Sequence, residues 1–123
     1  MSESTAIRWL AEPQEHDYPA AASFLSLIYD EHAAARLVAQ LRRAPMANFK
    51  AKDVFRAAGV SLLGLSNYHV EKDRAKIRQG KALSPLLLVR DKANAKLLIA
   101  DGYHRLCAVY GYDEDAVVPC KIV

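Results

Sequence analysis

Apolar and polar residues recur with helical spacing in the first half of the chain. Asp17-Tyr18-Pro19 suits a helix start, because proline is preorganised for the first helical position, and the apolar run Ala20 to Tyr29 continues it. Asp30-Glu31 begins a second amphipathic helix, which Pro45 ends. The pattern of Phe49 to Ala58 predicts a third helix. Residues 1–58 are therefore expected to be mainly helical.

Short apolar runs dominate the second half and predict strands. The expected strands are Leu86 to Arg90, Lys96 to Ala100 and Ala116 to Ile122. Helices are expected at Glu71 to Gln79 and at Tyr103 to Tyr110, the latter stopped by Gly111. Strand, helix and strand in succession form a right-handed parallel crossover, so the sheet should be mixed. The predicted fold class is α+β, a small mixed β-sheet with flanking helices and a helical N-terminal extension.

Two further segments have weaker patterns. Thr5 to Leu10 favours either a short strand or a docking arm. Val60 to Leu65 is apolar enough for a short strand, and the polar turn Ser66-Asn67-Tyr68-His69 follows it.

Composition narrows the class of protein. The length of 123 residues fits one domain, 1–123, with a mainly helical part at 1–58 and an α/β part at 60–123, and 52% hydrophobic residues suffice for a core. The net charge of +3 is too mild to indicate a nucleic-acid binder by itself. The sequence shows neither a membrane-length apolar run nor a signal-peptide pattern, so a cytoplasmic location is expected, with Cys107 and Cys120 as reduced core residues.

The stretch Asp101-Gly102-Tyr103-His104-Arg105 joins a predicted strand to a predicted helix. The first backbone N–H groups of such a helix lack partners within it, and they carry the positive end of its dipole. Together with His104 and Arg105 they would form a compact phosphate site, and Arg105 is expected to point to solvent. The alternative is an ordinary joint in which Asp101 caps the helix and Arg105 makes a salt bridge across its start.

Gly102-Tyr103-His104-Arg105 after an apolar strand resembles the Gly-x-His-Arg signature of the ParB/sulfiredoxin-like superfamily. The order of elements is similar from Leu65 onward, over about half of the chain. The resemblance implies a fold in which this turn holds nucleotide phosphates. Family members include CTP-binding partition proteins, sulfiredoxin, small-molecule kinases and proposed nucleases, so the implied function is nucleotide or phosphate handling.

The resemblance also implies roles for single residues. Asp101 matches the acidic residue of kinase-like members that carry Asp-Gly-x-His-Arg, which holds a metal ion or activates a hydroxyl. His104 either contacts a phosphate or leaving group or makes a structural hydrogen bond. Nucleoside triphosphate with Mg²⁺ is the expected cofactor, the metal being bridged by phosphates and one carboxylate because the sequence encodes no protein cage.

The turn from Asn67 to Asp73 should lie across the sheet end from the glycine turn, as in the resembling fold. Glu71 and Asp73 begin a helix there, and Glu71 either supplies acid-base function or is merely favoured by the helix dipole. Asn67 and His69 are candidates for contacts to a sugar or a base.

Two departures from the family limit the inference. Sulfiredoxin has its reactive cysteine directly before His-Arg, where this chain has Tyr103, so reductase chemistry is not expected. Partition proteins carry further DNA-binding and dimerisation domains after this module, and the sequence shows none after Val123, which disfavours a segregation role.

One basic cluster stands out, and it is either a solvated face or a nucleic-acid contact. Its members are Arg42, Arg43, Lys50, Lys52 and Arg56. Two functions therefore remain open. The first is a nucleotide-dependent phosphotransferase or hydrolase, and the second is a non-catalytic nucleic-acid-binding or regulatory module.

Overall fold

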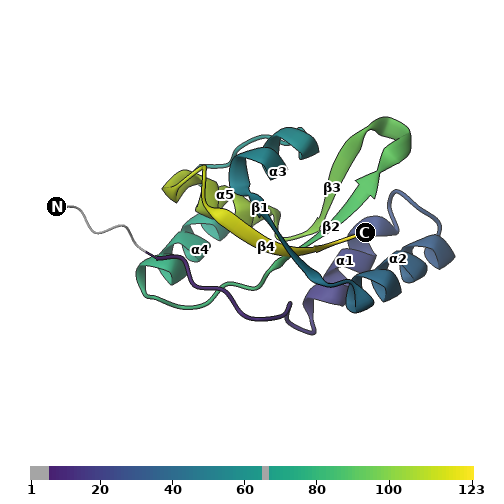
Figure 1. Ribbon diagram of the computed structural model, residues 1–123, viewed down its shortest axis with the longest axis horizontal. Coiled ribbons are helices and arrows are strands. Elements are labelled where there is room, and N and C mark those ends of the chain that lie inside the picture. Colours follow the sequence, from purple (N-terminus) through teal and green to yellow (C-terminus); the bar gives the residue numbers. More distant parts are fainter. Residues whose placement is uncertain (1–5, 65–66) are drawn as a thin grey trace.

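The computed structural model describes residues 6–64 and 67–123, and in these residues it shows a four-stranded sheet with helices on both faces (Figure 1). The strands are β1 (Met46–Lys50), β2 (Leu86–Asp91), β3 (Lys96–Asp101) and β4 (Val117–Ile122). The last three lie where the apolar runs predicted them. Their agreement with the sequence pattern confirms that local apolar runs specify these strands.

The sheet is mixed, with strand order β1-β4-β2-β3. β4 pairs antiparallel with β1 and parallel with β2, while β2 and β3 form an antiparallel hairpin. Helix α5 (Tyr103–Tyr112) connects β3 to β4, but these two strands run antiparallel with β2 between them, so the parallel crossover predicted for this strand, helix and strand is wrong. The parallel pair is β2 with β4, because the β2–β3 hairpin reverses the chain before α5 begins. The predicted α+β class with a small mixed sheet is thus confirmed.

The other helices form one layer on each face of the sheet. They are α1 (Asp17–Leu25), α2 (Glu31–Arg43), α3 (Ala51–Ala58) and α4 (Tyr68–Arg78), and a 3-10 turn η1 (Lys92–Asn94) connects the hairpin. Leu87 and Val89 of β2 pack with α1 and α2, whereas Leu86 and Leu88 pack with the layer of α3, α4 and α5. Successive strand residues point to opposite faces, so one strand serves both cores. The N-terminal helices are therefore one of the two helical layers.

Strand β1 differs from the sequence prediction, which placed Phe49 and Lys50 in a helix. Phe49 instead pairs with Val118 and Lys50 with Val117, and the helix begins only at Ala51. The N–H of Ala51 donates to the carbonyl oxygen of Ala116 at 2.9 Å. The partner strand is remote in sequence, so a local pattern could not reveal this pairing.

Other elements also end or form differently from the prediction. Residues 60–64 contain no strand, and Leu65 and Ser66 lie outside the described residues. Helix α1 ends at Leu25 instead of continuing to Tyr29. Helix α4 begins at Tyr68, directly after its cap Asn67, so Tyr68 and His69 are helical and not part of the predicted polar turn.

Gly111 lies inside α5 and does not stop it. A Cβ there would lie 2.7 Å from the Arg74 Nη1 atom, so the glycine leaves room for the Arg74 side chain.

The segment before α1 runs alongside the residues that precede β2. Trp9 forms a parallel bridge with Leu83, and the N–H of Leu10 donates to the Leu83 carbonyl oxygen at 2.8 Å. Thr5, the first residue of the predicted arm, lies outside the described part of the chain. Among the described residues, every helix is too short or too polar to cross a membrane.

Candidate anion-binding site

The joint between β3 and α5 requires glycine. Gly102 has a φ of 108°, a left-handed conformation that residues with a side chain rarely adopt. A Cβ added there would also lie 2.7 Å from Cγ of Leu86, which belongs to the buried core. Gly102 therefore both turns the chain and lets β3 approach β2 closely where α5 begins.

The start of α5 faces α4 across a cavity of about 190 Å³. Its lining residues come from the two helices and the glycine joint: His69, Lys72, Asp73, Lys76, Asp101, Gly102, Tyr103, His104 and Arg105. The first helical hydrogen bond of α5 joins the N–H of Leu106 to the carbonyl oxygen of Gly102 at 2.9 Å. The backbone N–H groups of residues 103–105 precede that bond, at the positive end of the helix dipole.

Arg105 lies inside the fold instead of pointing to solvent as expected, because only 14% of its side chain is exposed. Its Nη1 donates to the carbonyl oxygen of Ser84 at 2.6 Å, and its Nη2 pairs with Oδ2 of Asp101. The same Nη1 lies 3.6 Å from Oδ2 of Asp17 in α1. The guanidinium is thus committed to internal acceptors, which matches the alternative in which Arg105 makes a salt bridge across the helix start.

Asp17 and Asp101 place two carboxyl groups around this one guanidinium. Oδ2 of Asp17 accepts hydrogen bonds from the Ser84 hydroxyl and from the N–H of Gln14, the latter at 3.1 Å. Burial raises the pKa of Asp101, although Arg105 beside it acts in the opposite direction. Asp101 holds Arg105 and makes no capping hydrogen bond to α5. The sequence analysis missed Asp17 because it lies far from the motif along the chain.

His104 borders the cavity together with polar residues of α4. Its ring centroid lies 4.8 Å from that of His69. Burial lowers the pKa of His104, and the neighbouring His69 lowers it further, while Asp73 raises it. The pKa of Asp73 is itself raised, mainly by burial. An imidazole with a lowered pKa and a carboxyl group with a raised pKa therefore border the same cavity.

Lys72 and Lys76 also border the cavity, although they lie outside the Asp101–Arg105 motif. They lie on α4 with His69 and Asp73, so the four residues occupy positions i, i+3, i+4 and i+7 of one helical face. Nζ of Lys76 lies 3.9 Å from Oδ1 of Asp73, a loose contact. The helical spacing of these polar residues was visible in the sequence, but their proximity to Gly102 depends on the packing of α4 against α5.

Glu71 and Asn67 lie outside this cavity. Oε1 of Glu71 pairs with Nη2 of Arg78 at 2.8 Å. Oδ1 of Asn67 accepts hydrogen bonds from the N–H groups of His69 and Val70, so Asn67 caps the start of α4. Of the predicted site residues, the cavity brings together Asp101, Gly102, Tyr103, His104, Arg105 and His69.

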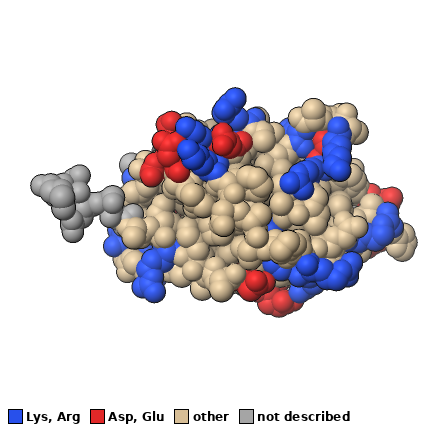
Figure 2. Space-filling view, in the orientation of Figure 1, with Lys and Arg blue, Asp and Glu red and all other residues tan. Residues whose placement is uncertain are grey.

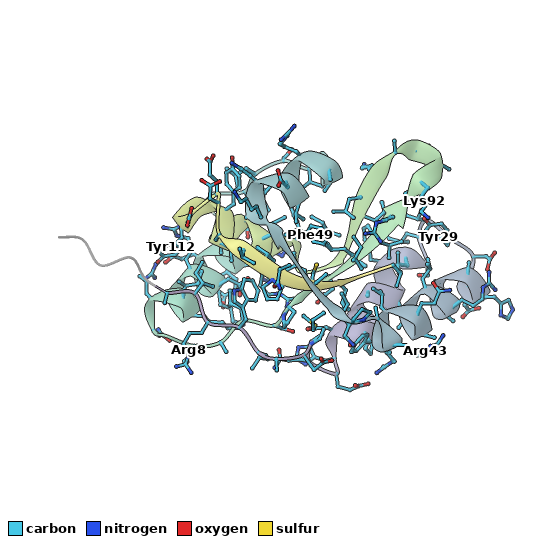
Figure 3. The ribbon with its side chains drawn as sticks, in the orientation of Figure 1. Arg8, Tyr29, Arg43, Phe49, Lys92 and Tyr112 are labelled. Carbon is cyan, nitrogen blue, oxygen red and sulfur yellow. The ribbon has the colours of Figure 1, made fainter. Side chains whose placement is uncertain are left out.

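The basic cluster separates into two groups in the fold. Arg42 and Arg43 precede β1, whereas the others lie at its far end or on α3; Figure 3 shows Arg43 and Phe49 well apart. Arg42 pairs with Glu15 at 2.7 Å, and Lys52 pairs with Asp115 at 2.6 Å. These cations are thus largely compensated locally, which weakens the case for a nucleic-acid surface.

Both cysteines are buried and unpaired. Burial raises the pKa of the Cys107 thiol, and it raises that of Cys120 to about 11. Such thiols are poor nucleophiles. Across residues 6–64 and 67–123, no three His, Cys, Asp or Glu side chains cluster as a metal site would require.

Comparison with known proteins does not assign this site. No family model matches the chain, and no curated protein or solved structure matches it at a significant level.

Proposed function

We propose that the cavity between α4 and the start of α5 binds the phosphate group of a small phosphorylated molecule or nucleotide. The observation that carries the proposal is the convergence of the N–H groups of residues 103–105 with Lys72 and Lys76 on one cavity. Backbone donors at a helix start favour anions, and ammonium groups add charge from the opposite wall. His104 would add a third side-chain contact.

The size of the cavity restricts what it holds. A volume of about 190 Å³ is below the range of about 300–1,000 Å³ that is typical of small-molecule sites. The cavity therefore suits the phosphate end of a ligand, with a sugar or base extending beyond it.

The test compares two double variants of equal charge change. Lys72→Gln with Lys76→Gln removes both ammonium groups from the cavity, whereas Arg43→Gln with Lys81→Gln removes two exposed cations that lie outside the cavity. Inorganic phosphate, ATP and CTP are titrated calorimetrically into each protein, with and without Mg²⁺. The cavity variant should bind about a hundredfold more weakly, at about tenfold per lost charge-assisted bond, and the control variant should bind as the wild type does. Equal affinities in all three proteins would reject the site.

A phosphotransferase or hydrolase activity is the second candidate, and the position of Asp73 favours it. A buried carboxyl group at the cavity wall can accept a proton from an attacking hydroxyl or water. Asp73→Asn should then abolish release of phosphate from ATP while phosphate binding persists. If the wild-type protein binds ATP but releases no phosphate with any of a panel of hydroxyl acceptors, the enzymatic proposal is rejected and only the binding function stands.

A further inference from the structure

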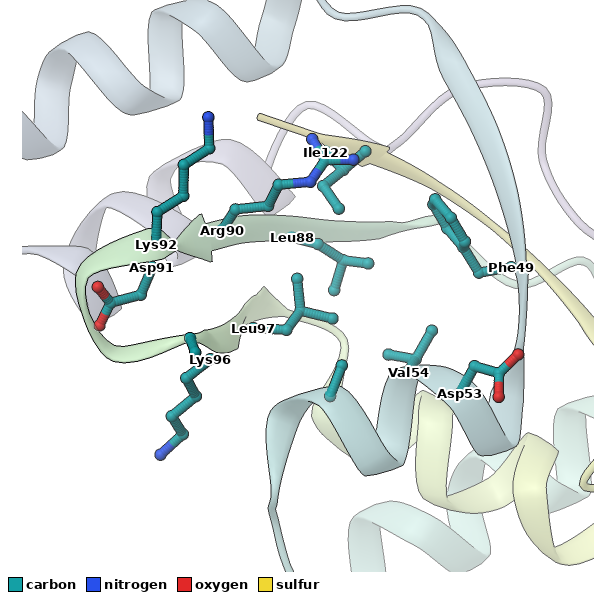
Figure 4. Close-up of a pocket in the computed structure, with 12 residues that line it drawn as sticks. Phe49, Asp53, Val54, Leu88, Arg90, Asp91, Lys92, Lys96, Leu97 and Ile122 are labelled. Atoms are coloured by element: carbon teal, nitrogen blue, oxygen red, sulfur yellow. The ribbon is translucent and has the colours of Figure 1, made fainter.

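A second, larger cavity lies on the other side of α3 from the polar site. It has a volume of about 400 Å³ and lies between α3 and the β2–β3 hairpin. Figure 4 shows side chains of Val54, Leu88 and Leu97 converging in this space, with Phe49 and Ile122 at its far side. Phe49 is a large apolar residue and yet 39% exposed. Leu88 and Val54 are buried beneath this surface, whereas Leu97 and Ile122 are partly exposed, so the accessible apolar surface is formed by Phe49, Leu97 and Ile122.

The groove exists because α3 is shorter than the sheet face it covers. The helix has only eight residues, and the hairpin projects beyond it (Figure 1). Arg90 lies opposite Leu97 in the hairpin and shares a strand face with Leu88, so its side chain emerges over the groove. In Figure 4 the guanidinium of Arg90 extends beside Ile122, and Lys92 rises from the same side.

The charged side chains at the rim of the groove differ in whether they have ion-pair partners. Within the described part of the chain, Arg90, Lys92 and Lys96 make no ion pair. Of the two acids of the rim, Asp53 has a cation nearby, because its Oδ1 lies 3.7 Å from Nη1 of Arg56. Oδ2 of Asp91 accepts a hydrogen bond from Nδ2 of the neutral Asn94 at 2.8 Å, so the charge of Asp91 offsets only part of that of the cations. Figure 2 shows the uncharged surface between the charged groups of α3 and the cations of the hairpin. The net charge beside the apolar floor is therefore positive.

We propose that this groove binds a small anionic amphiphile, namely a free carboxylic acid with a medium-length hydrocarbon chain. The hydrocarbon chain would lie on Phe49, Leu97 and Ile122, and the carboxylate would meet Arg90 and Lys92. The volume falls within the range of about 300–1,000 Å³ that small-molecule sites occupy.

The test uses decanoate as the probe, with decanol and decyltrimethylammonium as ligands of the same chain and different charge. Binding is followed by the backbone amide resonances of the ¹⁵N-labelled full chain. Decanoate should shift the resonances of residues 49, 97 and 122, and decanol should bind about tenfold more weakly because it lacks the charge. Equal affinities for the three ligands, or shifts confined to other residues, would overturn the proposal.

Two variants test separately whether decanoate binding depends on the cations of the groove and on its open space. Arg90→Gln with Lys92→Gln should reduce decanoate affinity to that of decanol, while Lys81→Gln, an exposed cation outside the groove, should change nothing. Ala57→Phe fills the groove from the exposed wall of α3 and should abolish binding, with unfolding in urea as the check on stability. Unchanged decanoate affinity in the charge variant would reject the carboxylate site even if Ala57→Phe failed to fold.

Other occupants would appear as distinct outcomes. Sedimentation of the wild type as a dimer that Ala57→Phe converts to a monomer would assign the groove to a second copy and overturn the proposal. Retention on anionic lipid vesicles without any response to free decanoate would assign it to a membrane surface and would overturn the proposal equally.

Discussion

The two ends of β3 border cavities of opposite character. At the Asp101 end the cavity is polar, and its arginine, Arg105, is nearly buried between two carboxyl groups. At the Lys96 end the groove is apolar, and its arginine, Arg90, is exposed without an ion-pair partner among the described residues. The same residue type thus connects elements of the fold at one end of the strand and is exposed to solvent at the other.

The largest effect is expected from removing the two arginines in turn. Arg105→Ala leaves Asp17 and Asp101 buried without a cation, and breaking a buried ion pair in this way costs about 3–5 kcal/mol of the free energy of unfolding. Arg90→Ala should change it by less than about 0.5 kcal/mol, as exposed substitutions usually do. Urea unfolding of both variants measures the difference. Similar values for the two would contradict the division between a structural and an available arginine.

Replacing two glycines with alanine tests whether the backbone is more constrained at the polar end of β3 than at the end of α3. Gly102→Ala combines a φ of 108° with a Cβ that would lie 2.7 Å from Leu86, so we expect a loss of about 3 kcal/mol. Gly59→Ala at the end of α3 has a φ of 64° but meets nothing within 4 Å, so it should cost only about 1 kcal/mol. The unfolding midpoints in urea decide between them. A loss at Gly59 as large as that at Gly102 would remove the case for a close approach of β3 to β2.

Anion binding at the polar cavity should depend on pH through His104. Its pKa is lowered from 6.5, so the imidazole is neutral at pH 7.5 and becomes positive as the pH falls through the lowered value. Sulfate keeps its charge over this range, and its binding should tighten by about tenfold once the pH lies below the lowered pKa. Calorimetry over a series of pH values from 7.5 downward, on the wild type and on His104→Gln, gives the measurement.

The control for this pH dependence is Asp73→Asn, because protonation of Asp73 would favour sulfate in the same direction. If His104→Gln retains the full pH dependence and Asp73→Asn loses it, the response belongs to the carboxyl group. The groove at the other end of β3 contains no histidine among its lining residues. Decanoate binding there should not follow the His104 titration.

The smallest expected effect is that of Asp73→Asn on the free energy of unfolding. Its folded-state pKa is raised above 3.8, so the folded protein binds more protons than the unfolded chain between that value and the raised one. The contribution to stability is therefore present below pH 3.8 and is lost as the pH rises through the folded pKa. Asp73→Asn should be slightly more stable than the wild type at pH 7, with a shallower pH dependence of the unfolding midpoint. A variant less stable at pH 7 would show that contacts of the carboxylate outweigh its burial.

Local patterns predicted much of the fold because they depend on near neighbours. The runs at Leu86 and Lys96 and the glycine joint at Gly102 are specified by residues within a few positions. Strand β1 was missed because Met46–Lys50 is short and half polar, and only its pairing with β4 makes it a strand. The helical prediction at Phe49 followed from the amphipathic helix that begins two residues later.

The candidate site was predicted in position but not in its charges. Gly102 and His104 border the cavity as the motif suggested, yet the role of Arg105 depends on Asp17, which packs against it from the opposite helical layer. Lys72 and Lys76 reach the cavity only through the packing of α4 on α5. Such contacts join segments that no short pattern spans, so they required the three-dimensional arrangement.

The central position of β4 has a consequence for synthesis in the cell. Met46 of β1 pairs with Lys121, and Leu86 of β2 pairs with Cys120, so both neighbours are translated long before the strand that connects them. At a rate of about 5–20 residues per second, β1 remains unpaired for on the order of several seconds after it leaves the ribosome. Unpaired strand edges recruit strands of other chains. The nascent protein is therefore most exposed to aggregation, and most dependent on chaperones, until residues 117–122 have emerged.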